Sequence, residues 1–214
     1  MSDIFREIDE DIRRDNFAKL WARYRVHVLA LLAILILGTA AFTGWREYRL
    51  HQRQAEGERF AAALDLVRDG KEAEAADRFA TLSTQAGGGH AVLATLELAA
   101  LKARAGDSNA AVALYDRLSA DSSVDQSYRD VATLLGARYA LDKGDPQKVI
   151  DRLKPLTDAD SSFRATALEF TALAQLKSGD KAAAQKTFQQ LADDSSAPGG
   201  ARQRATQMLM ALGS

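Results

Sequence analysis

Residues 99–118, AALKARAGDSNAAVALYDRL, contain the features of one helical hairpin. Two runs rich in Ala and Leu are interrupted by Gly106 and Asp107, a pair that can close one helix and cap the next. Ala99 stands seven residues before Gly106, and Tyr115 stands nine residues after it. Small residues let helices cross closely, and large residues fill the space between them. The segment therefore predicts a helix, a tight turn and a second helix.

Three further segments align with this one on a turn glycine, and the four glycines are 36, 38 and 35 residues apart. The turn pairs are Gly70-Lys71, Gly106-Asp107, Gly144-Asp145 and Gly179-Asp180. An Ala recurs seven residues before each glycine, Ala or Val five after it, an aromatic residue or Leu nine after it, and Leu twelve after it. In that order the sets are Ala63, Ala99, Ala137 and Ala172; Ala75, Ala111, Val149 and Ala184; Phe79, Tyr115, Leu153 and Phe188; Leu82, Leu118, Leu156 and Leu191. A period of this length predicts an α-solenoid of about four stacked hairpins.

The turns are expected to share their chemistry. Each turn glycine should adopt the left-handed conformation that closes the first helix of its unit. Asp107, Asp145 and Asp180 then supply a capping carboxylate for the second helix. Lys71 lacks that oxygen, and the acidic first turn beginning at Glu72 favours the positive end of the helix dipole instead.

Polar or Gly-rich connectors and a proline predict where the other helices end. The connectors at residues 84–90, 120–126 and 158–162 are polar or Gly-rich. Pro155 is expected to end or bend the second helix of the third unit. A last helix over residues 200–212 should cover the open end of the stack.

From Phe60 to about Ser196 this pattern resembles the tetratricopeptide repeat. The chain departs from that repeat in two ways, since its periods exceed 34 residues and the proline that usually ends a unit is missing from all four. The alternative is a generic array of helices whose alanines reflect helix propensity. Either way the soluble region, residues 60–214, is expected to be all-α.

Residues 26–45, VHVLALLAILILGTAAFTGW, contain no Asp, Glu, Lys or Arg. A helix of this length spans about 30 Å, the thickness of a bilayer's hydrocarbon core. Trp21 and Tyr24 precede the segment, and Tyr48 follows it, as interfacial aromatic residues would. We expect an uncleaved signal-anchor, with a buried core helix and a signal peptide cleaved near Ala41 as the alternatives.

The segments on either side of this span bear less directly on its orientation in the membrane. Basic residues only slightly favour the side of residues 1–25, and this bias alone does not fix the orientation. A short tail ahead of a single span commonly stays in the cytoplasm, so we expect residues 46–214 on the far side. Ile4, Ile8 and Ile12 recur every fourth residue in the tail, which predicts an amphipathic helix on the membrane surface or against a partner helix. Residues 46–59 are expected to form a juxtamembrane helical linker.

Composition argues against several classes of function. Residues 46–214 carry 22 basic and 23 acidic side chains, so nucleic acid is not an expected partner. The chain has no Cys, and its three His residues are scattered, which predicts neither a metal site nor a cofactor. No catalytic constellation stands out, and we expect the protein not to be an enzyme.

Stacked hairpins present a concave face on which an extended segment or a helix can lie. In the tetratricopeptide register, two positions of each unit face that groove, six and two residues before the turn glycine. They are Leu64, Ala100, Arg138 and Leu173, and Arg68, Arg104, Asp142 and Lys177. An apolar floor with a mainly basic rim suits an unfolded or nascent polypeptide. The alternative for Leu64 and Leu173 is that they belong to the core between repeats.

The whole layout is similar to a narrower family, the bacterial inner-membrane proteins of the YfgM type. The resemblance rests on the tail strings FREIDEDIRRD and LWARY, the string WREY that ends the span, and the repeats that follow. It implies a single-pass protein with a cytoplasmic amino terminus and a periplasmic repeat domain. The implied partners are Sec translocon subunits and a membrane-anchored periplasmic prolyl isomerase-like chaperone, and the implied role is a scaffold and chaperone.

Two other functions fit the same pattern. One is an anchored receptor whose repeats lie in the cytoplasm. The other is a secreted binding module released by signal cleavage.

Overall fold

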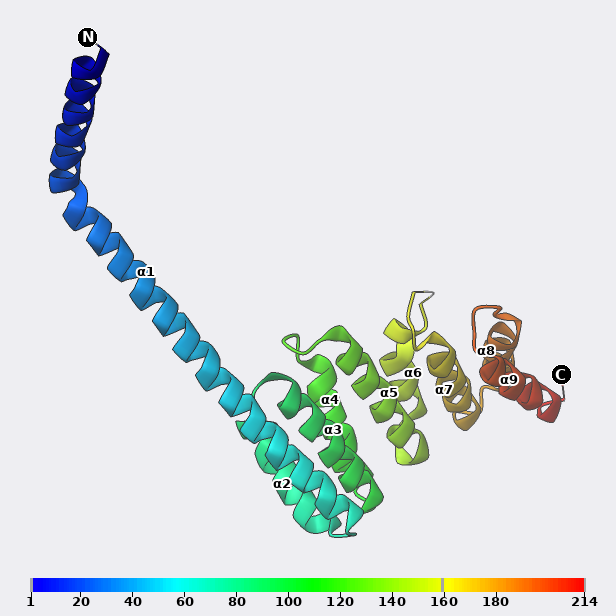
Figure 1. The fold of residues 1–214 in the computed structure, drawn as a ribbon. Helices are drawn as coiled ribbons and strands as arrows, with labels where there is room; N and C mark the ends of the chain where they lie inside the picture. The colour runs from blue at the N-terminus through cyan, green and yellow to red at the C-terminus, as the bar shows by residue number, and fades with distance from the viewer. Residues whose placement is uncertain (1, 159, 214) are drawn as a thin grey trace. The chain divides into compact units, whose positions relative to one another are not determined.

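The computed structural model describes residues 2–158 and 160–213, and the side chains of these residues except those at 2–20, 22, 27, 28, 33 and 143. All regular structure within these ranges is helical (Figure 1). The chain divides into two compact units, residues 1–54 and 55–214. Helix α1 (Ser2–Arg68) contributes residues to both units. The expectation of an all-α protein is confirmed.

In the first unit, α1 carries a segment that is long and apolar enough to cross a membrane. Its aliphatic side chains are exposed, for example 68% at Ile34 and 69% at Leu37. Thr39 donates its hydroxyl to the Leu35 carbonyl at 2.9 Å, so this polar group is satisfied within the helix. The Ile stripe of the tail falls outside the described side chains.

The second unit consists of hairpins packed in chain order (Figure 1). First helices also contact the first helix of the next hairpin, namely α3 with α5 and α5 with α7. The hairpins are residues 55–68 of α1 with α2 (Glu72–Gln85), α3 (Gly88–Arg104) with α4 (Ser108–Ala120), α5 (Gln126–Lys143) with α6 (Pro146–Leu153), and α7 (Arg164–Lys177) with α8 (Lys181–Asp193). Helix α9 (Gly199–Ala211) follows and packs against α7 and α8. This is the stacking of an α-solenoid.

The repeated positions form the core. All sixteen residues predicted from the spacing are buried, and the most exposed of them, Leu118, is only 6% exposed. All of them except Ala184 fall into four apolar clusters distributed along the stack. The spacing of these residues in the sequence therefore identified the buried face of each helix that contains them.

Helix capping is as predicted at each turn, and three of the four turn glycines have the predicted left-handed conformation. Asp107, Asp145 and Asp180 each accept a hydrogen bond from a backbone N–H of the first turn that follows. Lys71 makes no such bond. Gly70, Gly106 and Gly179 have φ values of +75°, +85° and +86°, in the left-handed region.

The prediction was wrong for Gly144, whose φ is −83°. In the other turns the first helix ends two residues before the glycine, which then needs the left-handed conformation. Helix α5 instead continues to Lys143, so Gly144 itself caps the helix and donates its N–H to the Ala140 carbonyl at 2.7 Å. The third turn is thus built differently from the rest.

Helix ends show one further correction. The predicted connector at 84–90 is shorter, because α3 already begins at Gly88. The connector at 120–126 agrees with the observed helix ends, and α6 ends at Leu153 and passes into a short 3-10 turn that contains Pro155. The predicted last helix is α9, displaced by one residue.

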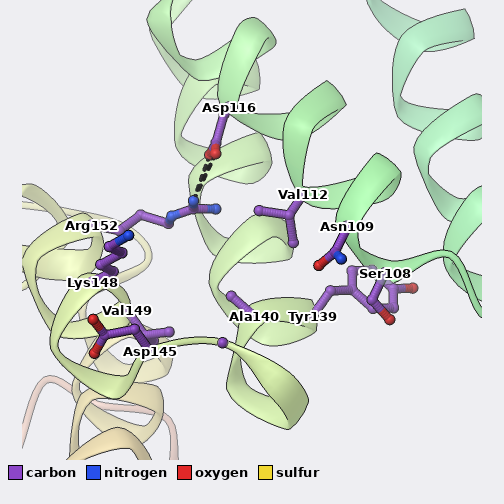
Figure 2. Close-up of a pocket in the computed structure, with 11 residues that line it drawn as sticks. Ser108, Asn109, Val112, Asp116, Tyr139, Ala140, Asp145, Lys148, Val149 and Arg152 are labelled. Atoms are coloured by element: carbon purple, nitrogen blue, oxygen red, sulfur yellow. Dashed lines mark hydrogen bonds and ion pairs between the residues drawn. The ribbon is translucent and has the colours of Figure 1, made fainter.

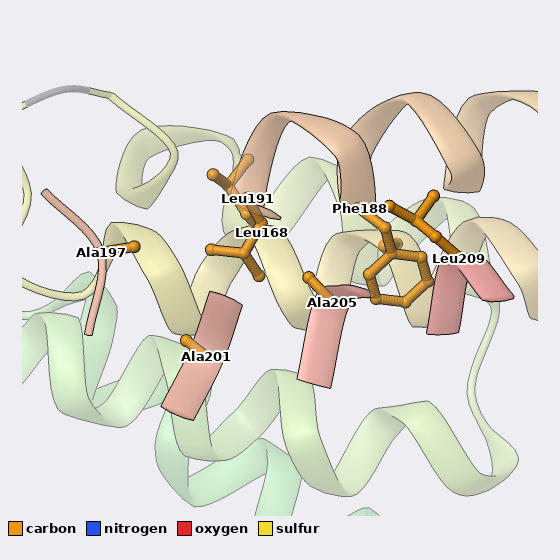
Figure 3. Packing of buried hydrophobic residues seen from close by; sticks show 8 residues of the cluster. Leu168, Phe188, Leu191, Ala197, Ala201, Ala205 and Leu209 are labelled. Atoms are coloured by element: carbon orange, nitrogen blue, oxygen red, sulfur yellow. The ribbon is translucent and has the colours of Figure 1, made fainter. Parts of the chain in front are cut away.

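Helix α9 covers the end of the stack. Phe188 and Leu191 of α8 pack in one apolar cluster with Leu168 of α7 and the α9 residues Ala205 and Leu209 (Figure 3). The guanidinium group of Arg204 donates two hydrogen bonds, of 2.7 and 2.8 Å, to the carboxylate of Glu169. Apolar packing and this two-point ion pair together hold α9 on α7.

Candidate protein-binding surfaces

The eight residues predicted to line a binding face all lie on the first helices of the hairpins. Leu64 and Arg68 are on α1, Ala100 and Arg104 on α3, Arg138 and Asp142 on α5, and Leu173 and Lys177 on α7. Helices of this set contact one another in succession, as α3, α5 and α7 do. The eight residues thus share one set of helices, and their role in binding stays a prediction.

The predicted floor is mostly half-buried. Leu64 packs against the cluster formed by α1, α2 and α3, and Leu173 packs against the cluster at the carboxyl end of the stack. Both side chains contribute to packing within the array, as the alternative interpretation expected. Ala100 is half-buried, whereas Arg138 is exposed.

The predicted rim is already engaged in contacts within the chain. Arg68 pairs with Asp65 at 2.8 Å, and Arg104 pairs with Glu72 at 3.2 Å. Both pairs are largely exposed, so each contributes at most about 1 kcal/mol and a partner's carboxylate can compete for them.

Two rim residues meet across a repeat boundary. The ammonium group of Lys177 donates hydrogen bonds to the carbonyls of Leu141 and Asp142, at 2.6 and 2.7 Å. These carbonyls lie in the last turn of α5, where a cation also favours the negative end of the helix dipole. Lys177 therefore joins α7 to α5, a structural role that the spacing did not predict.

Arg138, which occupies a floor position, is the cation of the predicted set best placed to meet a partner. It forms no ion pair within the described part of the chain, and its guanidinium carbon lies 5.8 Å from the centroid of the Tyr139 ring. Tyr139 stacks in turn on Tyr115 of α4, with ring centroids 5.9 Å apart. Burial raises the pKa of Tyr115 to about 12, with a smaller contribution from Tyr139. The two rings join the second hairpin to the third beneath an exposed positive charge.

A cavity of about 330 Å³ between the second and third hairpins was not predicted from the sequence (Figure 2). Its lining comes from α4, from the end of α5, from the unusual turn and from α6. The lining residues are Ser108, Asn109, Val112, Asp116, Tyr139, Ala140, Gly144, Asp145, Lys148, Val149 and Arg152. Two signals in the sequence bear on it, the longer spacing to Gly144 and the early end of α6 before Pro155.

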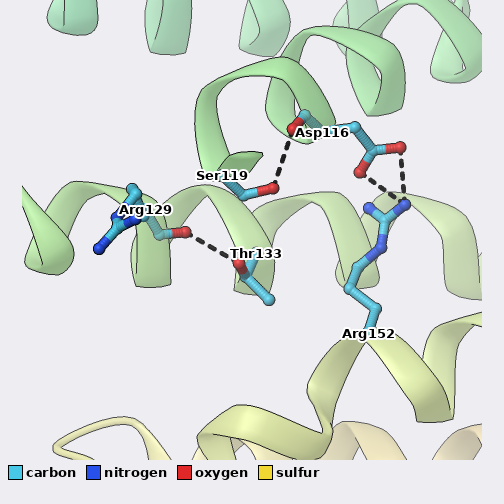
Figure 4. Close-up of polar contacts among 5 residues, drawn as sticks. All are labelled: Asp116, Ser119, Arg129, Thr133 and Arg152. Carbon is cyan, nitrogen blue, oxygen red and sulfur yellow. Dashed lines mark hydrogen bonds and ion pairs between the residues drawn. The ribbon is translucent and has the colours of Figure 1, made fainter. Parts of the chain in front are cut away.

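An ion pair crosses one side of this cavity. Arg152 of α6 reaches Asp116 of α4, with nitrogen–oxygen distances of 2.7 and 2.9 Å (Figure 4). The Asp116 carbonyl also accepts a hydrogen bond from Ser119 at 3.0 Å. A Cβ atom at Gly136 of α5 would overlap the Arg152 guanidinium, so the glycine lets this side chain pass close to the helix.

Comparison with known proteins identifies the family. The sequence profile of the tetratricopeptide repeat-like domain matches residues 18–213. The chain belongs to the tetratricopeptide repeat-like domain family. The match begins ahead of the apolar segment 26–45, so this family's sequence pattern includes that segment as well as the repeats.

A solved structure shares the tetratricopeptide repeat-like fold. It is a crystal structure of nearly identical TPR-like repeats of a Podosopora anserina protein described as a kinesin light chain. The identity is 16%, the TM-score is 0.56, and the alignment covers 72% of this chain and 83% of the other. No match was found among curated proteins. Folds of this family typically bind other proteins rather than catalyse reactions.

Proposed function

We propose that this protein is a membrane-anchored scaffold that binds other proteins and takes no part in catalysis. One observation carries the proposal: α1 contains both the apolar segment and the first helix of the first hairpin. Side chains of Ile34 and Leu37 are exposed along that segment, and an apolar surface of this kind is stable in lipid. The anchor thus restricts the repeat domain to a membrane plane, which raises its effective concentration near membrane partners.

We further propose association with the Sec translocon from the periplasmic side of a bacterial inner membrane. The resemblance to YfgM-type proteins supports this setting, and the profile match across the apolar segment agrees with the same layout. In this setting the protein would hold a membrane-anchored prolyl isomerase-like chaperone near the channel exit. It would also bind emerging unfolded segments reversibly, as a holdase does.

Clients are proposed to bind the face formed by the first helices of the hairpins. Arg138 is exposed there and lies on α5, in the third of the four hairpins. Its positive charge would attract acidic stretches, and the half-buried apolar side chains nearby would contact apolar ones. The nearly balanced charge of residues 46–214 favours a polypeptide over a nucleic acid.

The test is photocrosslinking from position 138 of the full chain in intact bacterial cells. A photoreactive residue at exposed Lys186 of α8 is the matched control, because it lies on a second helix. We expect Sec subunits, periplasmic chaperones or secreted chains to be captured from position 138 and not from position 186. Capture of none of these from either position, or equal capture from both, would overturn the proposal.

The setting is tested separately. A reporter fused after Ser214 should be active only outside the cytoplasm, and the membrane-bound protein should keep Met1 or Ser2 as its first residue. Reporter activity confined to the cytoplasm would support the anchored receptor instead. A mature terminus near Ala41 would support the secreted module.

A further inference from the structure

The cavity between the second and third hairpins lies where the repeat departs from its own pattern. The turn at Gly144 lacks the left-handed glycine of the other turns, and α6 has 8 residues where α4 and α8 have 13. A short second helix leaves less side-chain volume beside α4. The space that remains is lined by residues of α4 on one side and by α5, the turn and α6 on the other (Figure 2).

The interior of the cavity is apolar. Val112, Tyr139, Ala140 and Val149 contribute aliphatic or aromatic surface. Val149 is buried, whereas Val112 and Tyr139 are half-buried and stay accessible. A volume of about 330 Å³ lies at the lower end of the range for binding pockets, roughly 300–1,000 Å³, so it can admit a large side chain.

The charges at the edge of the cavity are not equivalent. Arg152 and Asp116 neutralise each other. The Asp145 carboxylate keeps its negative charge but is held at the amino-terminal end of α6 by the Gln147 N–H, where the helix dipole favours it. Lys148 is exposed, and within the described part of the chain it forms no ion pair. The cavity therefore combines an apolar interior with a cation at its edge, Lys148, whose ammonium group is open to a partner's carboxylate.

We infer that this cavity is a second docking site, for a segment of a partner protein that carries a large apolar side chain beside an Asp or Glu. The apolar side chain enters between Val112 and Tyr139, and the carboxylate pairs with Lys148. The inference rests on the proposed function as a protein-binding scaffold and adds a site formed mainly by second helices. It lets one chain hold two proteins at once, one on each set of helices.

The experiment selects peptides from a display library of random 12-residue sequences on the detergent-solubilised full chain. Val112→Trp fills the cavity, and Lys148→Glu reverses the charge at its edge. Lys186→Glu on α8 is the matched control, with the same charge change on a second helix outside the cavity. Because these positions are not in the core, each variant should melt within about 2 °C of the parent by circular dichroism.

The parent protein should enrich peptides with Asp or Glu next to Leu, Ile, Phe or Met. Their binding should fall about five- to thirtyfold in Lys148→Glu and should be lost in Val112→Trp, with no change in Lys186→Glu. Selection on Lys148→Glu should in turn favour Lys or Arg in place of the acid. This exchange of preference does not depend on how well Val112→Trp folds.

Three results would overturn the inference. They are the absence of any enriched peptide, enrichment that both cavity variants retain, and self-association of the parent that Val112→Trp abolishes, which would make a second copy of the chain the occupant. Failure of this site is distinguishable from failure of the proposed function, because capture from position 138 would persist. If capture from position 138 failed as well, the scaffold proposal itself would fall.

Discussion

Replacing Phe188 with Ala tests whether the array is held together by contacts between neighbouring units. Phe188 is 1% exposed and lies in the cluster at the carboxyl end of the stack, whose members all come from residues after Arg164 (Figure 3). Ala205 of α9, which lies near Phe188 in the same cluster, is too small to refill the space (Figure 3). A truncation of this kind costs about 3–5 kcal/mol.

Because repeats in a solenoid contact only their neighbours, the loss should be local. Hydrogen exchange of backbone amides, followed by mass spectrometry on the full chain in detergent, reports it by segment. A loss of 3–5 kcal/mol corresponds to exchange faster by about two to three and a half powers of ten in residues 164–211. Exchange in residues 72–104 should stay within about threefold of the parent.

Phe79 provides the mirror-image variant. It occupies the same repeat position in the first unit, is 0% exposed and packs in the cluster of α1, α2 and α3. Phe79→Ala should accelerate exchange in residues 55–104 and leave α8 and α9 unchanged. If either variant accelerated exchange equally at both ends, the array would unfold as one unit, and the nearest-neighbour reasoning would be refuted. Acceleration of less than tenfold near Phe188 would refute the packing argument.

Three further changes have expected outcomes in circular-dichroism melts of the full chain. Gly106→Ala places a side chain at φ +85° and should lower the free energy of unfolding by about 1–2 kcal/mol. The same change at Gly200, in a helix with room for a methyl group, should raise it by up to about 1 kcal/mol. A loss of stability in both variants would contradict the conformational argument. Asp107→Ala removes a helix cap and should cost about 1 kcal/mol, and an unchanged melting temperature would show that the cap adds nothing. Because the folded pKa of Tyr115 is raised from 10 to about 12, the folded state holds this proton longer than the unfolded state does, and stability should fall between these two pH values. Tyr115→Phe should remove that part of the pH dependence, and an equal slope in both proteins would place the titrating group elsewhere.

Much of the fold could be predicted because its determinants are local in the chain. The distance from each turn glycine to an Ala, an aromatic residue or a Leu fixes which face of a helix is apolar, and all sixteen such residues are buried. Capping by Asp107, Asp145 and Asp180 is also local, since each carboxylate reaches an N–H only two or three residues away. Gly144 shows the limit of this reasoning, because the helix before it extends one residue further than its counterparts do.

The candidate sites could be predicted less well, because they depend on distances between repeats. Lys177 was expected to line a binding face, yet its ammonium group is held by two carbonyls of α5, 35 and 36 residues earlier in the chain. The distance between α7 and the end of α5 cannot be read from the spacing of residues in the sequence.

The sequence by itself determined the helical hairpins, their number and order, their buried faces and a helix apolar enough to cross a membrane. These follow from periodicity, helix capping and the absence of charge over residues 26–45, all of which act within a few turns of helix. Only the tertiary structure decided which charges are neutralised inside the protein and where space remains. Arg152 pairs with Asp116 while Lys148, one turn away, forms no ion pair within the described residues, and a cavity opens beside a shortened α6. Such outcomes depend on how helices from different repeats approach one another, since both burial and ion pairing are set by distances of a few ångströms.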